Sequence, residues 1–150
     1  MKALSEFRIL TKRLNGVLDL LDKGVADQYR NLRTVSMGEM QYLQGINTLD
    51  PSYWQGRVIL FNCQTPRHRD IRNPPAKWTP LHAAGGFTEG GSLFIHELNL
   101  RLWYLLGDLI FLRGSLLSHS VEPWSGGQRI SAAYFSHELF WKYFNQRLSL

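Results

Sequence analysis

Residues 118–136 read SHSVEPWSGGQRISAAYFS. Two β-prone runs, 118–122 and 128–136, flank a short segment that holds Pro123 and the pair Gly126-Gly127. Because paired glycines favour a tight hairpin turn, we expect the second run to return as a strand beside the first. The stretch therefore predicts antiparallel β structure in the C-terminal part of the chain.

Further short β-prone runs precede this stretch, separated by Gly, Pro and Asn rather than by helices. They cover residues 58–62, 79–87, 92–96, 100–105 and 108–112. Short strands at this spacing are typical of an all-β sandwich or barrel. We therefore predict a mainly β fold.

Helical segments are expected at both ends of the chain. Apolar residues recur at helical spacing over residues 3–35, with an interruption at Gly24, and again over 138–148. Residues 37–49 are compatible with either a helix or a loop. We predict a single domain over residues 1–150, with helical support from 1–50, a β core from 57–137 and a C-terminal helix from 138–148.

The composition excludes several classes of protein. With 150 residues, 44% of them hydrophobic, the chain can bury the core of one globular domain and is not a low-complexity protein. No apolar run approaches the ~20 residues of a membrane helix. Glu6 and Arg8 precede any hydrophobic stretch, which is unlike a secretory signal. We therefore expect a soluble intracellular protein with no membrane partner.

Cysteine usage narrows the chemistry further. Cys63 is the single cysteine of the chain. One cysteine excludes both a disulfide framework and a thiolate zinc cluster. Its apolar neighbours predict that Cys63 is a small core residue.

The net charge of +5 makes an acidic partner plausible, with nucleic acid as the first choice. The excess is concentrated in one segment, where only Asp70 opposes the cations Arg57, Arg67, Arg69, Arg72 and Lys77. Charge alone nevertheless favours a mildly basic protein with no such partner.

The segment His68-Arg69-Asp70 places an imidazole and a carboxylate two residues apart, and such residues point to the same side of a strand. His119, in the predicted strand 118–122, can supply a third ligand. Two histidines and one carboxylate leave three positions of an octahedral metal open, as in non-haem Fe(II) oxygenases. We predict a metal site at His68, Asp70 and His119, and we interpret His82 and His96 as structural.

Arg129 and Ser131 follow the glycine pair and share one face of the predicted strand 128–136. The predicted hairpin brings that face close to His119. A guanidinium fork and a hydroxyl are the groups that a buried dicarboxylate cosubstrate needs at its far carboxylate. Trp124 lies in the same turn, beside the predicted site.

Two competing motifs fail on inspection. A kinase catalytic loop also begins His-Arg-Asp, but it needs an asparagine five residues after the aspartate, where this chain has Pro75. A zinc-protease helix needs His-Glu-x-x-His, and neither His96-Glu97 nor His137-Glu138 continues to a second histidine.

Taken together, these residues resemble the TET/JBP family of Fe(II)- and 2-oxoglutarate-dependent dioxygenases. The resemblance rests on residues 68–73 (HRDIRN), His119 and residues 129–137 (RISAAYFSH). Residues 107–111 (GDLIF) and 124–129 (WSGGQR) resemble its compact fungal branch. The family implies a double-stranded β-helix, or jelly roll, over roughly residues 57–140, with helices before and after it.

The resemblance also implies roles for single residues and a set of cofactors, namely Fe(II), 2-oxoglutarate and O2. His68, Asp70 and His119 match the iron ligands, Arg129 the arginine that pairs with the distal carboxylate of 2-oxoglutarate, and Ser131 its hydroxyl partner. Asn73 and His137 match residues that contact a flipped methylated base, and Phe135 stands where the animal enzymes carry a base-stacking tyrosine. Arg72 replaces a histidine of the animal pattern and can add a phosphate or base contact.

The function implied is oxidation of the methyl group of a modified nucleobase, with 5-methylcytosine in DNA as the first choice. This is the chemistry of DNA demethylation, and it implies a nuclear location if the protein is eukaryotic. The fold hosts many substrates, so the same iron chemistry on N6-methyladenine, thymine, RNA, a protein or a small molecule stays open. A non-catalytic nucleic-acid-binding module stays open as well. An enzyme that acts on a base in a duplex must flip it out, and stacking on an aromatic ring offsets part of that cost.

Overall fold

The computed structural model describes residues 2–40 and 44–148. They form two compact units. Gly56–Glu138 is one unit, and the segments up to Gln55 and from Leu139 form the other. That residues 1–150 act as one domain stays a prediction.

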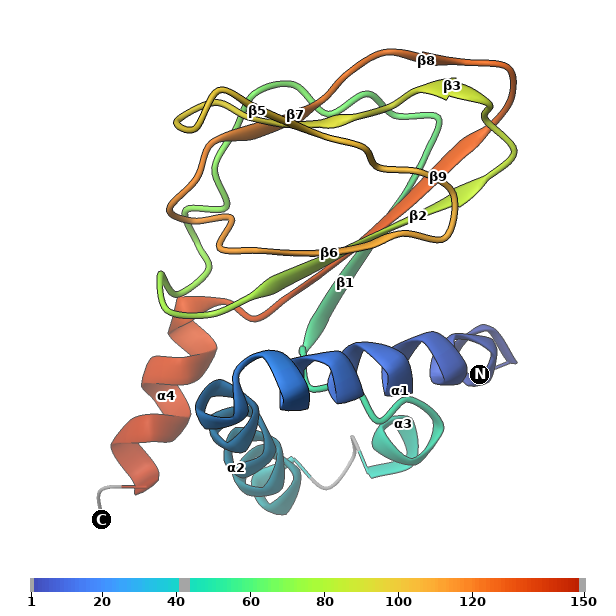
Figure 1. Cartoon of the computed structure of the whole chain (residues 1–150). Coiled ribbons are helices and arrows are strands. Elements are labelled where there is room, and N and C mark those ends of the chain that lie inside the picture. Colours follow the sequence, from blue (N-terminus) through green and yellow to red (C-terminus); the bar gives the residue numbers. More distant parts are fainter. Residues whose placement is uncertain (1, 41–43, 149–150) are drawn as a thin grey trace. The chain divides into compact units, whose positions relative to one another are not determined.

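The helical unit contains four helices within the described residues: α1 (Lys2–Leu21), α2 (Lys23–Glu39), α3 (Gln44–Leu49) and most of α4 (Glu138–Leu148) (Figure 1). The helices predicted over 3–35 and 138–148 are confirmed. The break falls at Asp22 instead of Gly24, because the Asp22 carboxylate accepts a hydrogen bond from the Val25 amide (3.1 Å) and caps α2. Of the open segment 37–49, residues 37–39 belong to α2 and 44–49 form α3, while 41–43 lie outside the described residues.

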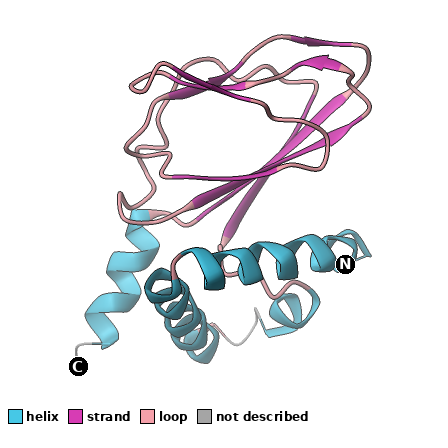
Figure 2. Cartoon of the chain, in the orientation of Figure 1, coloured by secondary structure: helices cyan, strands magenta, loops and turns pink. Residues whose placement is uncertain are grey.

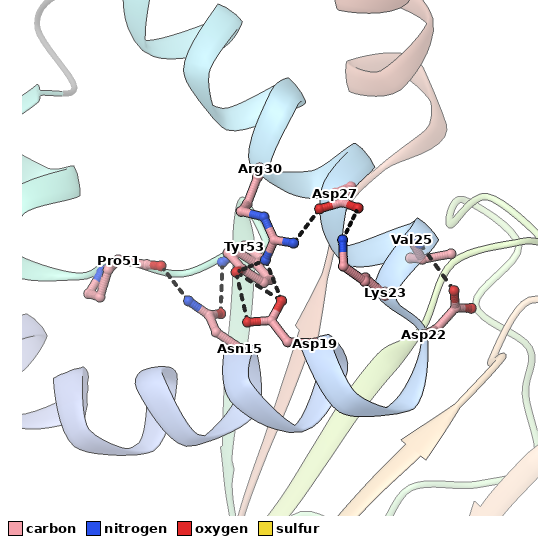
Figure 3. A network of polar contacts seen from close by, with 9 residues as sticks. All are labelled: Asn15, Asp19, Asp22, Lys23, Val25, Asp27, Arg30, Pro51 and Tyr53. Carbon is pink, nitrogen blue, oxygen red and sulfur yellow. Dashed lines mark hydrogen bonds and ion pairs between the residues drawn. The ribbon is translucent and has the colours of Figure 1, made fainter.

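A polar network ties α1 and α2 to the segment that follows α3 (Figure 3). The Arg30 guanidinium donates to the carboxylates of Asp19 and Asp27 and to the Tyr53 hydroxyl. Asn15 Nδ2 donates to the Pro51 carbonyl (2.8 Å). The buried core of this unit includes Leu14, Leu18, Tyr29, Leu32 and Trp141. None of the described helices has the length and apolarity needed to cross a bilayer.

The β unit forms three antiparallel sheets. Figure 2 shows the strands as two layers that face each other. One sheet has the order β1-β9-β2-β6, the second β5-β4-β7 and the third β3-β8. The predicted mainly β fold with helices at both ends is confirmed. The strands are β1 (Gly56–Phe61), β2 (Thr79–Gly85), β3 (Glu89–Gly90), β4 (Leu93–Ile95), β5 (Leu100–Leu102), β6 (Leu109–Leu112), β7 (His119–Val121), β8 (Trp124–Ser125) and β9 (Arg129–Phe135).

The predicted hairpin of runs 118–122 and 128–136 is wrong. β7 pairs with β4, whereas β9 pairs with β1 and β2 in the other layer. Gly126 and Gly127 adopt positive φ angles (78° and 149°), and a Cβ at these positions would collide with Thr88 and the Gly86 carbonyl. The turn therefore packs against residues 86–88 and carries the chain from one sheet to the other.

The core position predicted for Cys63 is also wrong, because this residue is exposed. β1 ends at Phe61, and Asn62 adopts a positive φ of 49° that turns the chain. Cys63 therefore follows the strand into a surface segment. Buried side chains of the β unit include Ala83, Phe87, Leu93, Ile95, Tyr104, Leu112 and Val121.

Candidate metal and cosubstrate site

His68 and His119, although far apart in sequence, are held side by side by an isolated β-bridge. The His68 amide donates to the His119 carbonyl (3.0 Å), and the His119 amide donates back to the His68 carbonyl (2.9 Å). Their rings lie 4.3 Å apart between centroids. The bridge therefore brings a loop residue into register with the first residue of β7.

Asp70 completes a cluster with these two histidines. Each of the three residues offers one ligand atom, and these atoms all lie within 4.8 Å of one another. Among the residues that the structure describes, this is the one group of three His, Cys, Asp or Glu side chains close enough to hold a metal ion. The structure thus brings together all three residues predicted as metal ligands.

Hydrogen bonds orient both imidazoles. His68 Nδ1 lies 2.9 Å from the Pro66 carbonyl, and His119 Nδ1 lies 3.0 Å from the Leu117 carbonyl. A carbonyl only accepts, so each Nδ1 carries the proton and each Nε2 keeps its lone pair for a metal. Burial lowers the pKa of His119, which keeps this ring neutral and able to ligate at neutral pH.

Gly114 makes room for the Asp70 carboxylate. The Asp70 amide donates to the Gly114 carbonyl (2.9 Å), and a Cβ at Gly114 would collide with Asp70 Oδ2. Any larger residue would therefore push the carboxylate away from the histidines. Sequence reasoning missed Gly114, because its role depends on a contact with Asp70, a residue of a distant segment.

Glu97 links the two segments that carry the ligands. Its Oε1 accepts from Arg69 Nη2 (2.5 Å), and its Oε2 accepts from the Ser118 amide (2.7 Å). The hydrogen bond from Arg69 lowers the pKa of Glu97 to about 2, so the bridge is charged at neutral pH. Arg69 lies between two ligands, and Ser118 precedes the third. The sequence contained no pattern that would have identified Glu97.

A cavity of about 390 Å³ opens beside the metal cluster. Eight of the nine residues predicted for the site line this cavity, namely His68, Asp70, Arg72, Asn73, His119, Ser131, Phe135 and His137. Asn73 is buried and donates to the Thr79 hydroxyl (3.2 Å). The ring of Phe135 lies across Gly56, where a Cβ would collide with it, and 5.0 Å from the His137 ring.

Of the clustered cations, Arg69 and Arg72 line the cavity. Arg67 Nε donates to the Ser118 hydroxyl (3.3 Å), and the Arg57 guanidinium lies 4.5 Å from the centre of the Tyr134 ring. The structure therefore brings only part of the basic segment to the cavity.

Arg129, the ninth predicted residue, does not line the cavity and is 1% exposed. Its Nε and Nη2 have no hydrogen-bond partner among the described residues. Its guanidinium carbon lies 5.0 Å from the ring centre of Tyr104, and 5.5 Å from those of Phe87 and Trp124. Removing one partner of a buried ion pair is strongly destabilising, because a charge is left uncompensated. A buried arginine without a carboxylate beside it therefore fits an anionic ligand.

Asn62 holds the backbone of Arg129 in place. Its Oδ1 accepts from the Arg129 amide and its own amide donates to the Arg129 carbonyl, both at 2.8 Å. These two contacts span 67 positions of sequence, so no local pattern pointed to Asn62.

Fold and site together define a jelly-roll protein with two histidines and a carboxylate around one point and a buried arginine nearby. No family model and no curated protein matches the chain. Among solved structures, it is similar to NgTET1 in complex with 5mC DNA, with a TM-score of 0.67 and 20% identity. The match covers 91% of this chain and 51% of that chain, so this chain spans about half of its length. At this identity, the likeness shows that the fold is TET-like.

Proposed function

We propose that this protein is an Fe(II)- and 2-oxoglutarate-dependent dioxygenase that oxidises the methyl group of a modified base, first 5-methylcytosine in DNA. The observation that carries the proposal is the convergence of His68, Asp70 and His119 within 4.8 Å at a cavity. The TET-like fold and the sequence resemblance to the TET/JBP family support it.

The donor set fits Fe(II). His68, Asp70 and His119 would hold the ion through two neutral imidazoles and one carboxylate, the ligand set of non-haem Fe(II) oxygenases. Bound there, iron would supply, with 2-oxoglutarate and O2, the oxidising chemistry that methyl hydroxylation requires. The chain's own residues fix the ligand geometry: backbone carbonyls orient the two rings, and the space over Gly114 admits the Asp70 carboxylate.

The buried cation fits the cosubstrate. 2-Oxoglutarate carries a second carboxylate, and Arg129 offers an uncompensated charge with unpaired donors close to the cavity wall. Ser131 lies two residues on in β9 and lines the cavity itself. We assign Arg129 and Ser131 to the distal carboxylate, as the family resemblance implies.

The remaining lining residues suit a flipped base. Asn73 and His137 can donate to or accept from a base edge, and Phe135 offers a ring for stacking. Arg72 at the same cavity can approach a DNA phosphate, whereas Arg69 is held in its ion pair with Glu97. The solved neighbour is described as a complex with 5mC DNA, which favours DNA over other substrates for this chain.

The test is turnover on defined substrates. The full chain is incubated with Fe(II), 2-oxoglutarate and oligonucleotides that carry 5-methylcytosine or N6-methyladenine, and the hydrolysed nucleosides and succinate are measured by mass spectrometry. We expect oxidised 5-methylcytosine and one succinate for each oxidation step of the methyl group. Oxidation of N6-methyladenine alone would overturn the choice of base, and succinate without base oxidation would point to another substrate class.

Matched variants separate a metal site from a general loss of fold. His68→Ala and Asp70→Ala should abolish succinate formation, whereas His96→Ala should not. His96 is bonded to the Ser120 hydroxyl (3.0 Å) and lies outside both the cluster and the cavity lining. Oligonucleotide binding that survives chelation, with no succinate formed by the wild-type chain, would identify a non-catalytic binding module instead.

A further inference from the structure

Tyr104 is a buried residue of the cavity wall that the proposed function has not used. It lies in the connection between β5 and β6, is 1% exposed, and lines the cavity. Its hydroxyl has no hydrogen-bond partner among the described residues. Buried polar atoms without a partner are rare in native proteins, and each one calls for a physical explanation.

The second observation is what stands beside Tyr104. The guanidinium carbon of Arg129 lies 5.0 Å from its ring centre. Two nitrogens of that guanidinium are also buried and have no hydrogen-bond partner in the described part of the chain. Asp108, the carboxylate of the same connection, accepts a hydrogen bond from the Leu105 amide (2.8 Å) and makes no ion pair with Arg129. A phenol and a guanidinium therefore stand together with no acceptor from the described chain.

Both groups are donors at neutral pH. Burial raises the pKa of the Tyr104 hydroxyl well above its ordinary value, so the phenol keeps its proton. The guanidinium has no acceptor atom at all. The missing partner must therefore be an acceptor, and because Arg129 is cationic, an anion is favoured.

We propose that the Tyr104 hydroxyl donates a hydrogen bond to the distal carboxylate of a 2-oxo dicarboxylic acid, beside Arg129, and makes the site selective for diacids. This inference rests on the proposed function, in which 2-oxoglutarate is the cosubstrate. Arg129 supplies the charge, and Tyr104 supplies a directed contact at a cavity-lining position. A site built to hydrogen-bond a substrate group rejects an analogue that lacks this group, because its buried donors stay unpaired.

The test compares two acids that differ only at the distal end. 2-Oxoglutarate ends in a carboxylate, and 2-oxopentanoate has a methyl group in its place. Binding of each acid to the Fe(II)-loaded chain is measured by calorimetry in oxygen-free buffer. The Trp124 ring lies 5.5 Å from the Arg129 guanidinium carbon, so tryptophan fluorescence gives a second readout.

Tyr104→Phe keeps the ring and removes only the hydroxyl. We expect its affinity for 2-oxoglutarate to fall by at least ~10-fold, as for one hydrogen bond to a charged group, with its affinity for 2-oxopentanoate unchanged. The selectivity for the diacid should fall by the same factor. Tyr143→Phe, the same change at an exposed position outside the cavity lining, should alter neither affinity.

The possible results separate this inference from the proposed function. An equal loss for both acids in Tyr104→Phe would indicate a general effect on packing and overturn the inference, as would no loss for 2-oxoglutarate. In both cases the proposed cosubstrate would stand, because the wild-type chain binds it. A wild-type chain that binds neither acid and forms no succinate would overturn the proposed function itself.

Discussion

Replacing Gly114 with alanine should weaken metal binding without unfolding the protein. A Cβ at this position would collide with Asp70 Oδ2, whereas the backbone of Asp70 is held by its hydrogen bond to the Gly114 carbonyl (2.9 Å). The carboxylate is the free end of a side chain, so it can rotate away from the new methyl group. This rotation relieves the collision, but it moves the Asp70 ligand atom away from those of His68 and His119.

The magnitude follows from what moves and what does not. Changes to groups that position a ligand lower metal affinity by ~10–100-fold, which corresponds to ~1.4–2.8 kcal/mol. The free energy of unfolding should change little. Alanine lowers the conformational entropy of the unfolded chain, which stabilises the folded state by ~0.4–1 kcal/mol and offsets a modest local strain. Gly114→Ala therefore separates metal affinity from stability.

The assay is titration of the metal-free chain with Co(II), followed by calorimetry and by the visible absorption of the bound ion, with thermal unfolding measured in parallel. Gly86→Ala is the matched control, because a Cβ there would meet no atom within 4 Å. We expect wild-type affinity in Gly86→Ala and a clear loss in Gly114→Ala. A folded Gly114→Ala protein with wild-type Co(II) affinity would refute the assigned role of Asp70.

Three further predictions concern Arg129, Glu97 and Phe135. Arg129→Met removes a buried guanidinium whose Nε and Nη2 have no hydrogen-bond partner among the described residues. The ligand-free chain should therefore be as stable in urea denaturation as the wild type or more stable by ~1 kcal/mol or more; a marked loss of stability would mean that the charge is compensated. Arg69 lowers the pKa of Glu97 to about 2, so the ionised carboxylate stabilises the folded state. The difference in unfolding free energy between wild type and Glu97→Gln should be fully present above about pH 4.5 and vanish as the pH falls through about 2. A difference that stays constant down to pH 2 would argue against the ion pair. Phe135→Ala should weaken binding of a 5-methylcytosine oligonucleotide by ~1–3 kcal/mol in a fluorescence-anisotropy titration, whereas Phe135→Tyr should keep it; equal losses in both variants would exclude stacking on this ring.

Much of the fold could be predicted because its longer elements carry periodic patterns. The terminal helices and the runs that became β1, β2 and β9 each contain enough residues for apolar spacing to show. β3 and β8 have two residues each, too few for any period, and they were not predicted. Secondary structure could thus be predicted where an element is long enough for its apolar residues to show a period.

Strand pairing could not be predicted in the same way, because it depends on contacts far apart in sequence. Gly126 and Gly127 predicted a hairpin from local turn chemistry alone. In the structure, these glycines allow close approach to residues 86–88, and β9 pairs with β2, the strand that precedes those residues. The local pattern therefore located the turn correctly but predicted the wrong pairing partner for the strand that follows it.

The same distinction applies to the site. His68 and Asp70 could be proposed together because their spacing is local, and His119 and Arg129 because they complete a known donor set. Gly114, Glu97, Asn62 and Tyr104 act only through contacts with distant segments, so their roles emerged from the three-dimensional structure. Residues that bind a ligand can be predicted from their type and spacing in the sequence, whereas residues that position them are identified only from contacts in the structure.

The groups left unsatisfied in the β unit are informative for the same reason. Within residues 2–40 and 44–148, the Tyr104 hydroxyl and two nitrogens of Arg129 are buried without a hydrogen-bond partner, whereas the carboxylates of Glu97 and Asp108 are hydrogen-bonded. If the protein were selected for stability alone, a phenylalanine and an apolar residue would serve better at both positions, since neither would leave a donor without an acceptor. These two buried donor groups lie next to each other, and Tyr104 lines the cavity that the metal cluster also lines. That placement is what a cosubstrate with a distal carboxylate requires, because binding would then satisfy donors that folding leaves unpaired.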